Sequence, residues 1–192
     1  MTDSTTKGDG SNEALLIIDM QIGCFHTPRH DSEGVISRIN KLSHAFRAKN
    51  LPVIFIQHNG IKENYLLPGT EDFEIVRELV ISDADYNVEK TVNGAFYQTN
   101  LKAILDSLNV GTLYITGLAT DFCVNSTIHA ALIEDFNIVV VSDCHTTADK
   151  LEMSASDIIK FHNFIWSNLT PTEGVISLKT HEEILNNGET LG

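Results

Sequence analysis

The feature that most constrains the fold is a set of short apolar runs that hardly alternate with polar residues. The four clearest runs are ALLIID at 14–19, VIFIQH at 53–58, TLYITG at 112–117 and NIVVVSD at 137–143. A strand with one solvated face alternates, whereas a strand covered on both faces reads as a continuous apolar stretch. The runs therefore predict buried strands of a parallel sheet, and GVISL at 174–178 predicts a last short one.

Segments with helical spacing lie between these runs, with apolar residues at every third or fourth position. Helices are expected over about 35–46, 101–108, 122–136 and 154–168. Ser154 and Asp157 resemble a capping box at the start of the last one. The stretch 59–90 has weaker periodicity and is expected to hold irregular structure and one short strand.

Strands that alternate with helices are joined by right-handed crossovers, which place helices on both faces of a mostly parallel sheet. The predicted fold class is therefore α/β with three layers. A chain of 192 residues, 42% of them hydrophobic, has the usual size of one domain. We expect a single domain over 14–192, preceded by a disordered polar tail over 1–13.

The charge balance narrows the classes of partner. The chain has 13 basic and 26 acidic residues and a formal net charge of −13, and a field of that sign repels phosphate backbones and anionic lipid headgroups. No run approaches the ~18 consecutive apolar residues of a membrane span. The cysteines, Cys24, Cys123 and Cys144, form no CxxC pair, which favours free thiols in a reducing cytoplasm. The expected partner is a small-molecule substrate, rather than nucleic acid or a membrane.

Residues that directly follow the apolar runs are the candidate site residues, because the ligand crevice of an open parallel sheet lies outside the carboxyl ends of its strands. This rule selects Asp19, Gln21, His58, Lys90 and the segments 120–123 and 143–145.

Among the cysteines, Cys123 has the position best suited to chemistry. The segment GLATDFC at 117–123 runs from a strand into a helix, where the helix dipole and free backbone N–H groups lower a thiol pKa from ~8.5 to roughly 3.5–7.5. A buried core cysteine is the competing interpretation, and position alone does not decide between the two. We expect Cys144 to be structural and Cys24 to line a loop or pocket.

Asp19 and Lys90 each have an ordinary interpretation as well, the acid as a turn cap and the lysine as a solvated surface charge. Taken with Cys123, they form a set suited to proton transfer. In such a set the lysine stabilises a thiolate and a carboxylate, and the carboxylate moves protons.

Three separated stretches resemble a known family. IIDMQ at 17–21, EKTVNGAF at 89–96 and GLATDFCVNST at 117–127 are similar, in order and spacing, to the signature stretches of the isochorismatase-like cysteine hydrolases. The resemblance extends over about 14–178. It implies a six-stranded parallel sheet with a Rossmann-like strand order, and it suggests a homo-oligomer.

The resemblance also implies the catalytic apparatus. The family's triad falls on Asp19, Lys90 and Cys123, and a cis peptide bond is implied between Leu118 and Ala119. The backbone N–H groups of Ala119 and Cys123 would form an oxyanion hole. Loss of one such donor typically costs on the order of 3 kcal/mol in the transition state.

One departure from the family concerns metal binding. Nicotinamidases of the family hold a divalent metal through an Asp-x-His arrangement and a second histidine, but this chain reads FIQHNGIKEN at 55–64. Ile56 stands in place of the aspartate, and His58 alone cannot build a site. We therefore expect no catalytic metal and no cofactor, and nicotinamidase activity is disfavoured. His58 is expected either to bond to backbone or to contact substrate.

Several residues near these motifs are candidates for an apolar substrate pocket, although aromatic residues at such positions are more often core. The candidates are Gln21, Phe25, Phe96, Tyr97 and Phe122.

The leading hypothesis is hydrolysis of a small amide or related C–N bond through a Cys123 thioester, with Asp19 as the base. A second hypothesis is hydrolysis of the vinyl ether of isochorismate, for which acid catalysis by the aspartate suffices. A third is a noncatalytic binding protein that retains the pocket.

Overall fold

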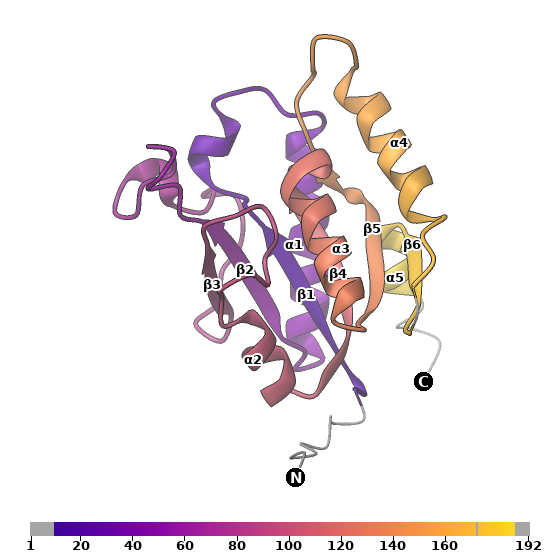
Figure 1. The fold of residues 1–192 in the computed structure, drawn as a ribbon. Helices are drawn as coiled ribbons and strands as arrows, with labels where there is room; N and C mark the ends of the chain where they lie inside the picture. Colours follow the sequence, from indigo (N-terminus) through magenta and orange to yellow (C-terminus); the bar gives the residue numbers. More distant parts are fainter. Residues whose placement is uncertain (1–9, 172, 187–192) are drawn as a thin grey trace.

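The computed structural model describes residues 10–171 and 173–186, and it contains a six-stranded sheet with helices on both faces (Figure 1). The strands are β1 (Asn12–Ile18), β2 (Val53–His58), β3 (Tyr86–Lys90), β4 (Val110–Leu118), β5 (Asn137–Thr146) and β6 (Ile176–Lys179). They lie in the order β3-β2-β1-β4-β5-β6, and each neighbouring pair is parallel. This is the Rossmann-type order, so the predicted three-layer α/β class is confirmed.

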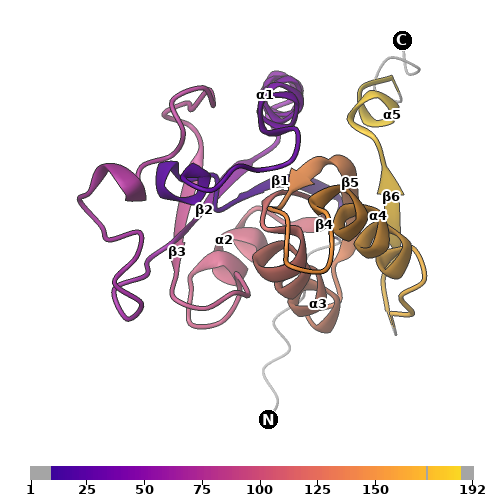
Figure 2. The same cartoon turned by 90° about the horizontal axis from the view of Figure 1, so that it is seen from above.

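Five α-helices in the described residues cover the sheet. They are α1 (Ser32–Ala48), α2 (Leu101–Ser107), α3 (Asn125–Ile133), α4 (Ala155–Trp166) and α5 (His181–Asn186). Seen from above, α1 and α5 lie on one side of the sheet and α2, α3 and α4 on the other (Figure 2). Ser154 caps α4 as expected, since its side chain accepts a hydrogen bond from the Asp157 backbone N–H. None of the helices in these parts of the chain is long and apolar enough to cross a membrane.

The central strand β1 shows why the apolar runs do not alternate. Its residues from Ala14 to Ile18 are fully buried, because β2 and β4 flank the strand and helices cover both faces. Successive side chains still point to opposite faces. Leu16 and Ile18 pack into the apolar cluster under α2, α3 and α4, whereas Leu15 and Ile17 pack into the cluster under α1.

The strands β4 and β1 approach each other closely at Gly117, where φ is 111°. A Cβ atom added to Gly117 would lie 2.2 Å from the carbonyl oxygen of Ile18, so the position requires glycine. This close approach holds the carboxyl end of β4 beside that of β1, and candidate site residues follow both ends.

Two expectations differ from the structure at element boundaries. Of the tail expected over 1–13, residues 1–9 lie outside the described residues, but Asn12 and Glu13 already pair with β4 as part of β1. The helix expected over 122–136 is divided into a π-helical turn (Thr120–Val124) and α3. The turn is wider than an α-helix because the Val124 N–H bonds to the carbonyl of Ala119, five residues back.

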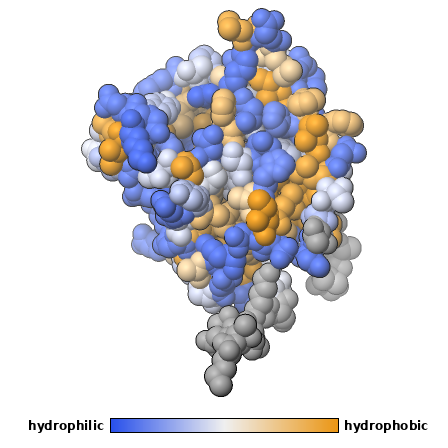
Figure 3. Space-filling model, in the orientation of Figure 1, coloured by the Kyte–Doolittle hydropathy of each residue, from blue (hydrophilic) through white to orange (hydrophobic). Residues whose placement is uncertain are grey.

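Apolar side chains remain exposed on the side of the molecule formed by α3 and α4 (Figure 3). They include Ile133 at the end of α3 and Phe161 and Phe164 on α4. Exposed apolar side chains that gather in this way are typical of interaction surfaces.

Candidate active site

Three of the predicted site residues meet at the carboxyl edge of the sheet. Asp19 directly follows β1, Lys90 is the last residue of β3, and Cys123 lies in the π-helical turn after β4. The strands β1 and β4 are neighbours, and only β2 separates β1 from β3. The strand order thus brings together residues that are far apart in the chain.

The ammonium group of Lys90 lies at the centre of this group. Its Nζ donates to Asp19 Oδ2 at 2.8 Å and to Cys123 Sγ at 3.4 Å, and the lysine side chain is fully buried. Burial alone lowers the pKa of a lysine, but here the Asp19 carboxylate and the Cys123 sulfur outweigh burial and raise the Lys90 pKa. Lys90 is therefore held as a cation beside the sulfur.

The thiol of Cys123 differs from the sequence-based expectation of a lowered pKa. Burial and the nearby Asp19 carboxylate raise the Cys123 pKa, and Lys90 offsets this only in part. The physical reason is position: Cys123 is half-buried in a π-helical turn that precedes α3, next to a negative charge, instead of lying in the first turn of an α-helix. The thiol donates toward Asn93 Oδ1 at 3.7 Å.

Asp19 has one carboxylate oxygen in use and one without a partner. Oδ2 accepts from Lys90, whereas Oδ1 is buried and has no hydrogen-bond partner among the described residues. A buried oxygen in this state is destabilising. Asp19 also has a left-handed backbone, with φ at 50°, which aspartate tolerates better than most residues. An acceptor held in this way is suited to receive a proton from a neighbouring group.

His58, the last residue of β2, is the fourth member of the group. Its Nδ1 lies 3.5 Å from Lys90 Nζ, and its Nε2 lies 3.9 Å from Glu63 Oε2. Burial and the Lys90 charge lower the pKa of His58. The imidazole therefore contacts Lys90 instead of backbone, and its contact with substrate stays a prediction.

Gln21, predicted to contact substrate, has a structural role instead. Its side chain is fully buried. Its amide donates to the carbonyls of His58 and Phe73 at 3.1 and 2.9 Å, and its Oε1 accepts from the His58 N–H at 2.7 Å. Gln21 thus fastens the end of β2 and the 3-10 turn Glu71–Phe73 to the segment after β1. Its place after a strand did not reveal that the side chain points inward.

The aromatic candidates separate into two groups. Phe96 packs against the same apolar cluster as Cys123. Phe122 is 51% exposed beside Cys123, and Lys150 Nζ lies 5.2 Å from the centre of its ring. Phe25 belongs to the opposite cluster, under α1, because the 3-10 helix that carries it (Ile22–Phe25) packs on that face. The structure therefore does not group Phe25 with Cys123.

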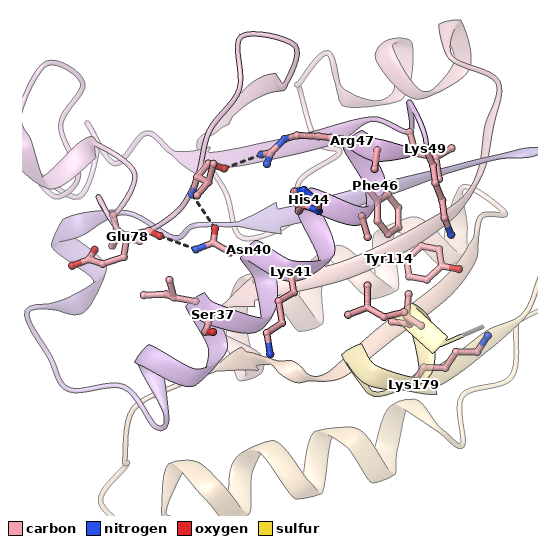
Figure 4. Close-up of a pocket in the computed structure, with 18 of the residues that line it drawn as sticks. Ser37, Asn40, Lys41, His44, Phe46, Arg47, Lys49, Glu78, Tyr114 and Lys179 are labelled. Carbon is pink, nitrogen blue, oxygen red and sulfur yellow. Dashed lines mark hydrogen bonds between the residues drawn. The ribbon is translucent and has the colours of Figure 1, made fainter. Parts of the chain in front are cut away.

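Phe25 lines a groove of about 1420 Å³ over α1. Figure 4 shows side chains of this groove, among them Asn40 and His44 of α1. The groove is bordered by α1 side chains such as Asn40 and His44 and by Leu185 of α5. None of the three residues that meet at the carboxyl edge lines it. The groove is therefore separate from the group formed by Asp19, Lys90 and Cys123.

Two further residues make contacts that the sequence did not reveal: Asn93, which faces the sulfur, and His145, which lies in the segment 143–145 selected above. Asn93 lies within a motif of the resemblance, but nothing in the sequence shows that its amide faces Cys123. His145 follows the apolar run of β5, and its buried ring bonds to Thr120 Oγ1 at 2.9 Å and to Asn163 Oδ1 at 3.0 Å. Burial lowers the pKa of His145 to about 4, so a neutral imidazole ties the π-helical turn to α4.

The described part of the chain contains no group of three His, Cys, Asp or Glu side chains that could hold a metal ion. Ile56 is buried within β2. A metal ion on His58 Nδ1 would meet the Lys90 ammonium, which lies 3.5 Å from that atom, and two cations at such a distance repel strongly. The donor set around His58 therefore does not fit a metal.

Comparisons with known proteins show the family to which the chain is similar. A profile of the isochorismatase domain matches residues 13–162. The uncharacterized isochorismatase family protein YaaI of Bacillus subtilis (strain 168) is 26% identical over 177 residues, which cover 86% of this chain and 97% of the relative. Nicotinamidase 3 of Arabidopsis thaliana is 28% identical over 159 residues, with 74% and 78% covered. A crystal structure of an isochorismatase family protein superposes with a TM-score of 0.81 at 29% identity, covering 89% of this chain and 99% of its own.

Proposed function

The chain belongs to the isochorismatase family of hydrolases, and from this premise we propose that it hydrolyses the C–N bond of a small amide through a thioester on Cys123. Asp19 acts as general base and then as general acid. Lys90 stabilises the negative charges on Asp19 and on the sulfur. The name of one relative, nicotinamidase 3, supports an amide as substrate.

The observation that carries the proposal is the position of Lys90 Nζ, 2.8 Å from a carboxylate oxygen and 3.4 Å from a thiol sulfur. A buried cation at this distance stabilises a thiolate as it forms, because charges interact strongly at low dielectric. An ion pair that only stabilised the fold would not need a thiol beside it. It would also gain no stability from Asp19 Oδ1, which is buried without a partner among the described residues.

In the first half of the reaction, Asp19 accepts the thiol proton while the sulfur attacks the substrate carbonyl. We propose that the proton leaves during attack and not before it, since burial and Asp19 raise the pKa of Cys123. The backbone N–H groups of Ala119 and Cys123 are proposed to hold the oxyanion. Asp19 then gives the proton to the nitrogen, and the C–N bond breaks. The amine departs, and the acyl group remains on the sulfur as a thioester.

In the second half, water replaces the amine. Asp19 takes a proton from the water molecule, and the oxygen attacks the thioester carbon. The C–S bond breaks, the sulfur recovers its proton from Asp19, and a carboxylic acid is released. One water is consumed for each amide, and the protein returns to its starting state.

The experiment is a screen of small amides, ureides and N-carbamoyl compounds for ammonia release, followed by a test of Cys123. We expect Cys123→Ala to abolish turnover while the fold is retained, and acid quenching during turnover to trap the acyl group on Cys123 for mass spectrometry. Cys144→Ala is the matched control, since Cys144 is fully buried in the cluster under α1 and should leave turnover intact. A Cys123→Ala protein that still turns over would refute covalent catalysis.

The same assays separate the other candidate functions. Release of pyruvate from isochorismate, unaffected by Cys123→Ala, would indicate vinyl ether hydrolysis. No turnover of any compound, together with a Cys123 thiol that titrates like that of a free peptide, would indicate a binding protein.

We also propose that the protein is a cytoplasmic homo-oligomer. The free cysteines Cys24, Cys123 and Cys144 support a reducing compartment. The exposed apolar side chains of α3 and α4 support a contact between copies. Size-exclusion chromatography with light scattering tests the oligomeric state, and a monomer at all concentrations would contradict it.

A further inference from the structure

The ammonium group of Lys90 has three N–H donors, and the structure places three acceptors around it. Two are Asp19 Oδ2 and Cys123 Sγ, and the third is His58 Nδ1 at 3.5 Å. The Lys90 side chain is fully buried, so a donor without an acceptor would be left unsatisfied. His58 completes the set.

This contact determines the protonation of His58. Lysine donates only, so Nδ1 can take part only with its lone pair, and the ring proton must then be on Nε2. Nε2 faces Glu63 Oε2 at 3.9 Å. A doubly protonated ring would present a second cation to Lys90 and could accept nothing from it.

We propose that His58 is a positioning residue, whose neutral Nδ1 holds the Lys90 ammonium between Asp19 and Cys123 and whose protonation releases that hold. The effect that we expect on turnover rests on the function proposed above. The effect that we expect on the reactivity of the Cys123 thiol does not depend on that function.

The backbone of His58 is held independently of its ring. Gln21 Oε1 accepts from the His58 N–H, and Gln21 Nε2 donates to the His58 carbonyl. The parallel pairing of His58 with Lys90 continues the ladder of β2 and β3. Substitutions of the imidazole therefore leave the end of β2 in place, and their effects report on the ring.

The charged groups that face His58 come from three elements. Burial and Lys90 of β3 favour the neutral ring. Asp19 after β1 and Glu63 in the loop after β2 favour the charged ring. The net effect is a lowered pKa of His58. His58 is then neutral at pH 7, and the hold on Lys90 is lost as pH falls through that pKa. Removing the Glu63 charge with Glu63→Gln should move the loss to lower pH.

The first experiment is ¹⁵N nuclear magnetic resonance of the histidine rings in the whole protein, with the His58 signals assigned by their absence in His58→Asn. We expect the Nε2–H form of a neutral ring at pH 7 and a titration below that of a free histidine, shifted further down in Glu63→Gln. A proton on Nδ1 would overturn the proposal, because Nδ1 could not then accept from Lys90.

The second experiment measures the alkylation rate of Cys123 by iodoacetamide at pH 7, with peptide mapping to separate it from the buried Cys24 and Cys144. Asparagine can place its oxygen near the position of Nδ1, whereas glutamine reaches toward Nε2 and leucine offers no acceptor. We expect His58→Asn to react nearly as fast as the wild type. His58→Leu and His58→Gln should react about tenfold more slowly, equal to one unit of thiol pKa. Equal rates for His58→Leu and the wild type, or for His58→Asn and His58→Leu, would overturn the proposal.

Turnover provides a separate readout once a substrate is known. We expect kcat to fall in His58→Leu with little change in KM, and the acid limb of the kcat profile to disappear in His58→Asn. If no substrate is hydrolysed but the alkylation order holds, the proposed function fails and the role of His58 stands. If turnover depends on Cys123 but the alkylation order is absent, the role of His58 fails and the function stands.

Discussion

Replacing Asp19 with Asn removes the charge that pairs with Lys90 while keeping nearly the same shape. The Asp19 and Lys90 side chains are 4% and 0% exposed, so the lysine would remain as a buried cation without a counter-charge. Breaking a buried pair in this way typically costs about 3–5 kcal/mol. Asparagine also tolerates a left-handed backbone, so the change adds no strain at φ 50°.

Titration of Lys90 sets the upper limit of this loss. A lysine with an ordinary pKa of about 10.4 can be neutralised at pH 7 for about 5 kcal/mol, at ~1.36 kcal/mol for each pH unit. In the wild type the Lys90 pKa is raised, so its stabilisation is present below the ordinary lysine pKa and is lost only above it. In Asp19→Asn burial lowers the Lys90 pKa, and stability should increase with pH. The difference between the two proteins should therefore shrink as pH rises.

Trp166, the single tryptophan, is fully buried and reports unfolding by fluorescence. We would measure denaturant unfolding of the wild type, Asp19→Asn and the Asp19→Asn/Lys90→Met double variant at pH 7 and near pH 9. The double variant should recover part of the loss, because it leaves no buried charge. The reasoning would be refuted if Asp19→Asn lowered the free energy of unfolding by less than about 1 kcal/mol at pH 7, or by the same amount at both pH values.

Two further predictions concern His145 and Gly117. The His145 pKa is lowered to about 4, so its contribution to stability is present above the ordinary pKa of about 6.5 and is lost as pH falls toward 4, by up to about 3 kcal/mol. His145→Gln should flatten the stability profile over that window, and an unchanged profile would contradict the assignment. Gly117→Ala should destabilise the fold by at least about 2 kcal/mol, because its Cβ would lie 2.2 Å from the Ile18 carbonyl. Gly69→Ala is the control in thermal unfolding, since Gly69 also has a positive φ, 83°, but has open space around it. An equal decrease of the unfolding temperature in both variants would contradict the steric argument.

The fold class could be predicted from the sequence because its signals are local. A continuous apolar run such as 14–18 identifies a strand covered on both faces, and the helical stripes between the runs imply crossovers. The same local signals located the candidate site. Asp19, Lys90 and Cys123 each follow or end a strand, and parallel topology places all such positions at one edge.

Only the tertiary structure decided the state of each side chain at that edge. Cys123 stands where a helix is expected to begin, yet burial and Asp19 reverse the predicted shift of its thiol pKa. Gln21 turns inward to bind backbone, and His58 contacts a cation. The physical reason is one of range. Position along a strand determines the edge that a residue reaches, whereas pKa values and hydrogen bonds depend on distances of a few ångströms between elements far apart in the chain.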